Sequence, residues 1–549
     1  MRFLAKALCW LFLFAGLRVP AAEPLDLSSW TLEEKAGQVL MVGFRSFEQV
    51  KAVRPGGVVL FSWNMPSVDA TRDLTKAIRE YASTSMKAPV FIATDHEGGT
   101  VLRLRKGLTA FPDAAAVGAT GDVETAFRVG KAMGHELASL GINMNLAPVL
   151  DLGNARSFLE NRVWGDVGGP VGTLTTAYMR GLESSRVLAV AKHFPGHGGS
   201  TGDSHFTLPQ VNKSFSALWN EDLEPFRRAV KEGVQAVMTA HVEVPAIDRG
   251  PASLSSKFVT TLLREQFGFK GLVLTDDLEM GGFTPVSGTP VEELALRALK
   301  AGTDIVLVVW SEKTQVKIRD RVVKAVRDGE VSEAWLDEKI RRIDGIRRTF
   351  ASPAAEEWDN PYWRENLRRS ESISLAESIP RRALHWIAGR SDQLLEGFAQ
   401  SWADSWMVMV PEGASARLWK RLRPQDEILV HRRRADGALV QQITKKLKRT
   451  LASKRPLVVV TGPRASSSED VFKVFRTQLG RRGLQAEDSS LVLWVHQGSK
   501  PVEFRLPPEK VKIGLVGLHS ASLASLIALT ETLRGPAASV RIPASRGWN

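Results

Sequence analysis

Cysteine is almost absent from this chain of 549 residues, because Cys9 is the only one. A single thiol excludes an internal disulfide and a metal site built from several thiolates. Repeats and low-complexity tracts are absent too, and the only marked apolar run outside the expected core lies at residues 7–17. With 44% hydrophobic and 24% charged residues, the composition is that of an ordinary globular protein. A chain of this length exceeds one core, so we expect two domains.

The first 22 residues have the three-part pattern of a secretory signal peptide. Arg2 and Lys6 precede the apolar run, and small residues follow it at Ala21 and Ala22. The run is too short to span a bilayer comfortably. We therefore predict a signal peptide over residues 1–22, cleaved after Ala21, with an uncleaved N-terminal anchor as the alternative. Export without disulfides indicates a bacterial periplasm or the exterior.

The net charge of +13 is unevenly distributed along the chain. Residues 381–549 contain 28 Lys and Arg against 14 Asp and Glu, which gives +14 and leaves −1 for the remainder. The densest runs are HRRR (431–434) and KKLKR (445–449). This basicity fits either a solvated face or contact with an anionic envelope polymer or membrane surface. No nucleic-acid-binding motif is present, so we expect no such partner, and we expect a monomer.

Eight short apolar runs alternate with mostly helical patterns in the first part of the chain. Several of the runs are continuously apolar, as strands buried on both faces are. The runs lie at 37–44, 56–62, 88–95, 142–151, 187–194, 236–242, 271–277 and 302–309. Amphipathic segments such as 122–141 and 217–233 lie between them. This order predicts a (β/α)8 barrel of the TIM type over residues 23–350, with an open doubly wound sheet as the alternative.

Polar side chains at the ends of these runs favour the barrel. Core packing would place apolar residues there, whereas barrel enzymes collect their chemistry at the carboxyl ends of the strands. The polar residues at these ends are Asp95, Asp151, Lys192, His193, His241 and Asp276. We therefore predict that they converge on one rim.

A second α/β unit is expected after the barrel. A helical pattern covers 312–350, and a polar connector follows over 351–380. Five more apolar runs then appear, at 406–413, 427–431, 456–462, 490–496 and 511–518. Helical patterns separate several of these runs, which predicts a smaller, basic, open α/β/α sandwich over residues 381–549.

The stretch KHFPGHGGSTGDSH, from Lys192 to His205, concentrates three histidines and four glycines after a strand. Three interpretations fit the residues alone. The histidines and Asp203 could bind zinc, although their spacing matches no zinc signature. One histidine could be held on a mobile loop for acid–base work. The segment could also be a buried polar turn, which would leave the other polar strand ends unexplained.

Several motifs together resemble the family 3 glycoside hydrolases, in particular the bacterial β-N-acetylglucosaminidases. The resemblance covers about residues 30–350. The segments that carry it, in chain order, are DHEGGTVLR (95–103), NRVWG (161–165), KHFPGHG (192–198) with DSH (203–205), MTAHVEVPAID (238–248) and LTDDLEM (274–280). The second part resembles the α/β/α domain of the two-domain members on weaker evidence.

The resemblance assigns Asp276 as the nucleophile, with its neighbour Asp277 as the rival. A retaining glycosidase needs an ionised carboxylate that bonds covalently to the anomeric carbon. The resemblance also implies that His205 is the general acid/base and that Asp203 orients it and raises its pKa. His197 would help the loop to fold.

The same resemblance implies sugar-binding roles for a further set of residues. These are Asp95, Arg103, Arg162, Lys192, His193 and Met280. Surface ion pairing for Arg103, helix capping for Arg162 and core filling for Met280 are the alternatives. The chain departs from the family pattern at His96 and Thr100, where glutamine and arginine are usual, and in the loop sequence before His205.

The sequence thus predicts an exported, retaining exo-β-N-acetylglucosaminidase that needs no metal and no organic cofactor. Its substrates would be peptidoglycan fragments or chito-oligosaccharides that end in GlcNAc. The acetamido group would serve recognition and not act as the nucleophile. A β-N-acetylglucosaminide phosphorylase and a non-catalytic wall-binding protein are the alternatives.

Overall fold

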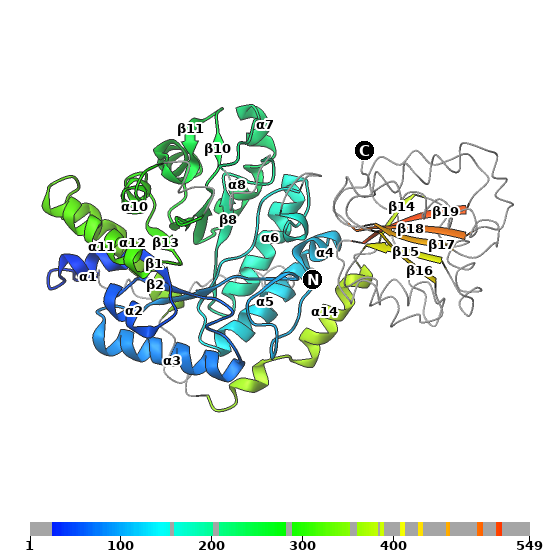
Figure 1. The fold of residues 1–549 in the computed structure, drawn as a ribbon, viewed down its shortest axis with the longest axis horizontal. Coiled ribbons are helices and arrows are strands. Elements are labelled where there is room, and N and C mark those ends of the chain that lie inside the picture. The colour runs from blue at the N-terminus through cyan, green and yellow to red at the C-terminus, as the bar shows by residue number, and fades with distance from the viewer. Residues whose placement is uncertain are drawn as a thin grey trace, which may run out of the picture.

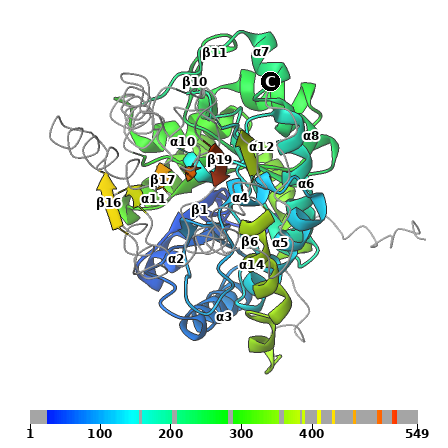
Figure 2. The same ribbon diagram turned by 90° about the vertical axis from the view of Figure 1, so that its right-hand side faces the viewer.

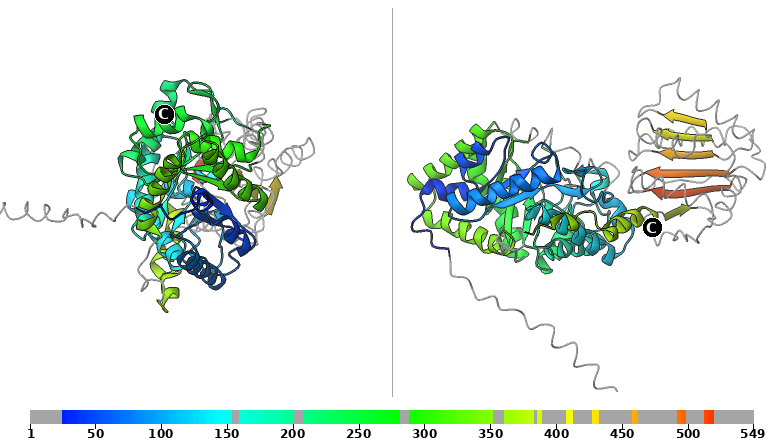
Figure 3. Two further views of the ribbon diagram at one scale, coloured as in Figure 1. Left: turned by 90° about the vertical axis from the view of Figure 1, so that its left-hand side faces the viewer. Right: turned by 90° about the horizontal axis from the view of Figure 1, so that it is seen from below.

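The computed structural model describes residues 25–153, 159–200, 208–280, 288–351 and 360–382, together with six strands between residues 385 and 518. Figure 1 shows a barrel covered by helices and a second sheet beyond helix α14 (Ser370–Arg382). The view from below in Figure 3 shows the same succession of barrel, α14 and sheet. Among the described residues, no helix combines the length and the apolarity needed to cross a membrane.

The barrel is a parallel sheet with eight strand positions, as predicted. Its strands are β1 (Leu40–Gly43), β2 (Gly57–Leu60), β3 (Phe91–Thr94), β6 (Met144–Asn145), β7 (Leu188–Ala189), β8 (Ala191–Phe194), β9 (Ala236–Thr239), β12 (Leu272–Asp277) and β13 (Ile305–Val308). The order of pairing is β7-β6-β3-β2-β1-β13-β12-β9-β8. Because β7 and β8 belong to one run broken only at Val190, the first and last strands of this order join and the barrel closes. This closure rules out the open-sheet alternative.

Helices surround the barrel on its outer side, as the opposite views in Figure 2 and the left panel of Figure 3 show. They are α1 (Leu32–Gln38), α2 (Phe47–Val53), α3 (Val68–Ser85), α4 (Ala114–Ala119), α5 (Val123–Ser139), α6 (Gly168–Glu183), α7 (Phe215–Asn220), α8 (Glu224–Lys231), the π-helix η3 (Lys257–Gln266), α10 (Val291–Lys300), α11 (Glu312–Arg327) and α12 (Glu333–Phe350). Buried strands and the inner faces of these helices form one apolar core. Glycine allows α5 and α6 to approach closely, because a Cβ on Gly130 would lie 2.1 Å from the carbonyl oxygen of Tyr178.

Two predicted helical stretches are divided in the structure, each for a local reason. Within 217–233, α7 ends at Asn220 and α8 begins anew at Glu224, with Pro225 in its first turn. A proline lacks the N–H that an uninterrupted helix would need there. Within 312–350, Gly329 adopts a positive φ of 74° between α11 and α12, and Ser332 caps the second helix.

Short hairpins and 3₁₀ turns lie at the carboxyl ends of the strands. Two small hairpins form there, β4 (His96–Gly98) with β5 (Val101–Leu102), and β10 (Glu243–Val244) with β11 (Asp248–Pro251). Two 3₁₀ turns, η1 (Glu160–Arg162) and η2 (Ala252–Leu254), follow β6 and β11. These segments carry several of the polar residues discussed below.

The connector and the second sheet follow the barrel. Within 351–380, a 3₁₀ turn η4 (Trp363–Asn366) and α14 form, and the side chains of Trp363, Leu375 and Ile379 are buried in the barrel's core. The second sheet has the order β14-β19-β18-β17-β15-β16, in which only β14 is antiparallel. Its strands are β14 (His385–Ala388), β15 (Met407–Pro411), β16 (Glu427–His431), β17 (Leu457–Thr461), β18 (Leu491–Gln497) and β19 (Lys512–Leu518). The five predicted strands are confirmed, and the helices predicted between them lie outside the described residues.

Candidate active site

A cavity of about 410 Å³ opens at the carboxyl ends of the barrel strands. Seven of the predicted site residues line it together: Asp95, Arg103, Arg162, Lys192, His193, Asp276 and Met280. They come from β3, the β4–β5 hairpin, η1, β8 and the end of β12. The convergence predicted from the strand ends is therefore found. Asp203 and His205 lie outside the described residues.

Lys192 holds two carboxylates at the bottom of this cavity. Its Nζ lies 2.9 Å from Asp95 Oδ1 and 2.8 Å from Glu97 Oε1, and its side chain is only 3% exposed. Arg103 Nη2 reaches the other oxygen of Asp95 at 3.0 Å. Arg162 grips Glu97 with two parallel bonds of 2.9 Å, from Nε and Nη2. Two acids and three bases thus form one buried network of charge-assisted bonds.

The network fixes the protonation of its acids. Burial by itself would raise the pKa of Asp95, but Lys192 and Arg103 outweigh it and hold that pKa below its usual value. Burial is likewise outweighed at Glu97, where Arg162 and Lys192 lower the pKa to about 2. Both groups are carboxylates at neutral pH and can accept hydrogen bonds from a ligand's hydroxyl groups.

Asp151 anchors the strand that carries His193. Its Oδ2 lies 2.6 Å from His193 Nδ1, and its Oδ1 accepts a 2.5 Å bond from the backbone N–H of His197. Burial opposes ionisation of Asp151, but His193 and His197 together lower its pKa below the usual value. Because Nδ1 of His193 faces the carboxylate, Nε2 is the ring nitrogen left for a ligand. Asp151 therefore orients an imidazole that lines the cavity.

The two adjacent aspartates of β12 occupy different environments. Asp276 Oδ1 accepts a 2.8 Å bond from the backbone N–H of Asp277. Burial would raise the pKa of Asp276, but His193, His241 and that backbone N–H lower it. Burial dominates at Asp277 and raises its pKa to about 7. Neighbouring acids whose pKa values are pushed apart suit different tasks, and Asp276 is the one that stays ionised.

Asp277 and His241 hold the end of β12 in place. Asp277 Oδ1 accepts bonds from the backbone N–H groups of Glu279 and Val309, both at 3.2 Å. His241 Nε2 lies 3.1 Å from the carbonyl oxygen of Asp277, and its Nδ1 lies 2.7 Å from Ser253 Oγ. Burial lowers the pKa of His241 and favours the neutral ring. Asp277, which lines the cavity together with Asp276, is thus bonded to the backbone that follows β12 and β13.

The match to a family model identifies this constellation. Residues 31–346 match the model for the N-terminal domain of glycosyl hydrolase family 3, which is more than half of the chain. The chain belongs to this family. A β-hexosaminidase of Psychromonas ingrahamii is 33% identical over 323 residues, which are 58% of this chain and 91% of that protein.

Solved structures agree with this family 3 assignment. A glycoside hydrolase family 3 β-N-acetylglucosaminidase from Paenibacillus superposes with a TM-score of 0.76 at 28% identity, over 94% of this chain and 99% of that one. NagZ from Neisseria gonorrhoeae, solved with N-trifluoroacetyl-D-glucosamine, is 29% identical with a TM-score of 0.50, over 62% of this chain and 98% of that one. The first of these neighbours spans both parts of the family 3 chain described here.

Sequence reasoning missed one residue of this family 3 site and assigned no role to two others. Glu97, which binds Lys192 and Arg162, was not singled out although it lies two positions after Asp95. Asp151 and His241 were recognised only as polar strand ends. The signal for all three was the same, namely a polar side chain at the carboxyl end of a strand. Their partners come from other strands, and no local pattern shows such partners.

The described residues do not supply a metal site to this family 3 barrel. Within the part of the chain that the structure describes, no group of three His, Cys, Asp or Glu side chains could hold an ion. Nδ1 of His193 lies beside Asp151, and Nδ1 of His197 lies 2.9 Å from Ser200 Oγ. The two other ligands of the zinc alternative, Asp203 and His205, lie outside the described residues.

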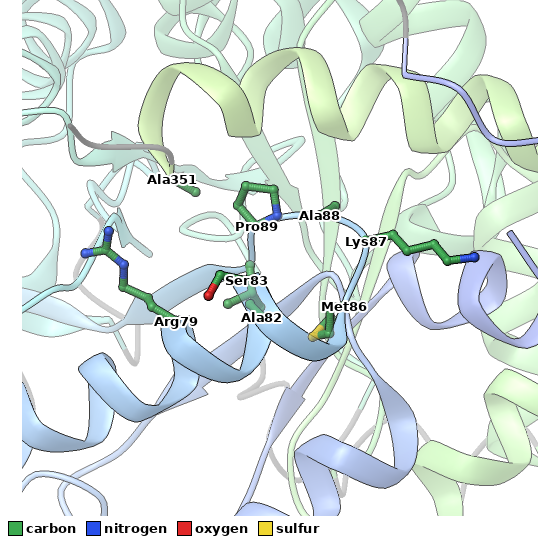
Figure 4. Close-up of a pocket in the computed structure, with 9 residues that line it drawn as sticks. Arg79, Ala82, Ser83, Met86, Lys87, Ala88, Pro89 and Ala351 are labelled. Atoms are coloured by element: carbon green, nitrogen blue, oxygen red, sulfur yellow. The ribbon is translucent and has the colours of Figure 1, made fainter. Parts of the chain in front are cut away.

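A second cavity, of about 320 Å³, lies at the opposite end of the family 3 barrel (Figure 4). It is formed by the end of α3, the segment that leads into β3, and Ala351. The close-up shows the Lys87 ammonium directed away from the other labelled side chains, and it lies 2.9 Å from Glu34 Oε2. In barrels, the amino ends of the strands serve stability and not chemistry. None of the predicted site residues lines this cavity.

Proposed function

We propose that this protein is a retaining exo-β-N-acetylglucosaminidase, which removes terminal GlcNAc from peptidoglycan fragments or chito-oligosaccharides. The observation that carries this proposal is an ionised carboxylate, Asp276, in the same cavity as a dense set of sugar-binding donors and acceptors. The names of the relatives support the same activity. A volume of about 410 Å³ is near the lower end for small-ligand sites and suits a single terminal sugar.

Asp276 is the nucleophile of this proposal. Its carboxylate attacks the anomeric carbon, the bond to the leaving-group oxygen breaks, and a covalent glycosyl-aspartate forms. Water then attacks the same carbon and releases the sugar with its original β configuration. A lowered pKa keeps Asp276 unprotonated for the first step.

The charged network positions the sugar for this attack. Asp95 accepts hydrogen bonds from ring hydroxyl groups, Lys192 and Arg103 donate to such groups, and Nε2 of His193 bonds a further hydroxyl. Arg162 fixes Glu97 and thereby Lys192. Met280 lies on the wall of the cavity. Groups held this firmly before the substrate arrives need no reorganisation when it binds.

His205 is the general acid/base of the proposal, and Asp203 orients it. An imidazole can protonate the leaving oxygen and later take a proton from water. We predict that His205→Gln lowers kcat/KM for the disaccharide chitobiose by about 100-fold. The loss should shrink to a few-fold for the 2,4-dinitrophenyl glycoside, whose leaving group needs no proton. Kinetics over a series of aryl leaving groups measure this difference, and an equal loss for every leaving group would contradict the role.

The product's stereochemistry tests the whole proposal. The 4-nitrophenyl β-glycoside of GlcNAc is incubated with the full chain, and the released sugar is followed by proton NMR. We expect the β anomer of GlcNAc to appear first and the rate to be the same with and without phosphate. Formation of a sugar 1-phosphate would establish the phosphorylase alternative. Binding to peptidoglycan without any turnover would establish the non-catalytic one.

We also propose that the protein is exported and that its basic second part retains it at an anionic envelope surface. The N-terminal signal pattern and the charge of +14 over residues 381–549 support this. Replacing Lys445, Lys446 and Lys448 by glutamine should weaken sedimentation of the full chain with anionic wall material at low salt. Substituting Lys76, Lys51 and Lys106 of the barrel is the matched control, and equal weakening by both sets would refute the retention.

A further inference from the structure

Two exposed tryptophans meet beside the catalytic cavity. Trp63 is 39% exposed and Trp310 is 56% exposed, although large apolar side chains are usually covered in a folded chain. Trp63 follows β2 and Trp310 follows β13, and these two strands flank β1 on either side. Their ring centroids lie 5.5 Å apart. Two such side chains from distant parts of the sequence therefore form one aromatic surface at the active-site end of the barrel.

Trp63 is the fixed part of this surface. Its ring stacks on Phe61 with a centroid distance of 4.6 Å and an interplanar angle of 10°, and the Arg45 guanidinium lies 4.5 Å from the same ring. Its Nε1 donates a 3.2 Å hydrogen bond to the carbonyl oxygen of Phe44. Trp63 thus carries Phe61 on its ring and Arg45 over the same ring, and it does not line the cavity. It braces its neighbour and does not itself receive a ligand.

Trp310 is the part left open. It lines the catalytic cavity, tilted by 42° from Trp63 and by 32° from Phe61. Its backbone N–H donates a 2.6 Å bond to Glu279 Oε2. Glu279 is three residues after Asp276, on the segment that leaves β12. The position of the exposed ring is therefore tied to the segment that carries the nucleophile.

We propose that Trp310, braced by Trp63 and Phe61, is the platform on which the ring of the leaving-group sugar stacks. The proposal rests on the proposed function, in which the sugar that is cleaved off occupies the cavity itself. A pyranose with equatorial substituents presents a face of C–H groups, and the face of an aromatic ring carries the complementary negative charge. A rigid ring at the mouth of the cavity binds that face at a low cost in side-chain entropy.

Comparing the effect of one substitution on kcat/KM for two substrates tests the platform. Trp310→Ala should lower kcat/KM for chitobiose by about tenfold, the effect of one aromatic contact. The same variant should hydrolyse the β-fluoride of GlcNAc within about twofold of the unmodified protein, because a leaving group of one atom cannot stack. Trp310→Phe should restore most of the chitobiose activity. Phe215→Ala is the matched control, since Phe215 is an aromatic of 44% exposure that does not line the cavity.

Two results with Trp310→Ala would overturn the platform. Equal losses with chitobiose and with the fluoride would mean that Trp310 only supports the fold of the site, and no loss with either substrate would mean that no sugar stacks on it. Repeating the measurement with GlcNAc linked to N-acetylmuramic acid shows whether a neutral or a carboxylate-bearing sugar stacks there. If the unmodified protein hydrolysed neither the fluoride nor the disaccharides, the proposed function itself would fail, whatever Trp310 does.

Discussion

Asp276→Ala is expected to lower kcat/KM for chitobiose by about 10⁴-fold or more, the scale seen when a covalent nucleophile is removed. The reason is that the first step of the proposed mechanism forms a bond between Asp276 and the anomeric carbon. The other carboxyl groups that line the cavity are engaged elsewhere, since Asp277 and Glu279 accept bonds from backbone N–H groups. Asp95 and Glu97 are each held by two basic side chains. Steady-state kinetics of the purified full chain measure the loss.

A small external nucleophile distinguishes the loss of a nucleophile from damage to the site. Azide can enter the space left by the carboxylate and attack the anomeric carbon from the same side. We therefore expect azide to restore turnover of the 2,4-dinitrophenyl glycoside by Asp276→Ala and to produce the α-glycosyl azide. A variant that is merely misfolded would not respond to azide.

Asp277 provides the matched control for this experiment. Asp277→Asn keeps the shape of a group whose pKa of about 7 already favours the protonated form below neutrality. The side-chain oxygen of the asparagine can still accept hydrogen bonds from the backbone N–H groups of Glu279 and Val309. We expect a loss far smaller than that of Asp276→Ala. A 2-fluoro or 5-fluoro glycoside should label Asp276, and a label found on Asp277 would refute the assignment.

The barrel could be predicted from the sequence because each strand is a short apolar run and each helix has an apolar stripe. The connections between them could not be predicted at the same level. The fifth run divides at Val190 because residues 188–189 pair with β6 while 191–194 pair with β9. Such a division depends on how the barrel closes, and the residue types along the run do not indicate it. Breaks that depend on a single residue type can be explained from the sequence, as with the proline at 225 and the glycine at 329.

The sequence predicted which strand ends carry the residues of the site, but it predicted only some of the contacts between those residues. A charged residue after a buried strand is conspicuous, so Asp95, Lys192 and Asp276 were found. Glu97 was missed because its meaning depends on Lys192 and Arg162, which lie 95 and 65 positions further along the chain. The aromatic pair of Trp63 and Trp310 joins the first and last parts of the barrel sequence, which meet because β1 lies between β2 and β13. Spatial neighbours of this kind follow from the fold and not from spacing.

Lys192→Met is expected to lower the free energy of unfolding of the barrel by about 3 kcal/mol, the lower end for a broken buried ion pair. The methionine fills similar space, so the cost arises from charge. Asp95 and Glu97 lose the cation that they share, and both are buried. Arg103 remains on the other oxygen of Asp95 and Arg162 remains on both oxygens of Glu97, which keeps the loss from the upper end of the range. Denaturant unfolding of the full chain, with the barrel transition fitted separately, measures it.

The pH dependence identifies charge as the cause. In the unmodified protein, Asp95 and Glu97 have lowered pKa values, so their stabilising contribution is complete above the unfolded pKa of about 4 and is lost only as the pH falls toward 2. Without Lys192 their folded pKa values rise, because burial is no longer fully opposed. As the pH falls, Asp95 and Glu97 of the variant therefore take up protons, and their uncompensated buried charge disappears. We therefore expect the difference in unfolding free energy between the two proteins to be smaller at about pH 5 than at about pH 7.

An exposed lysine gives the comparison that this prediction needs. Lys76 is 66% exposed and lies 3.8 Å from Glu80 on α3, so Lys76→Met should change the unfolding free energy by less than about 0.5 kcal/mol at either pH. A loss for Lys192→Met that is equally large at both pH values would show that packing around the lysine stem, and not the two carboxylates, accounts for it. The same measurement then decides whether charge balance maintains the network of Lys192, Asp95 and Glu97.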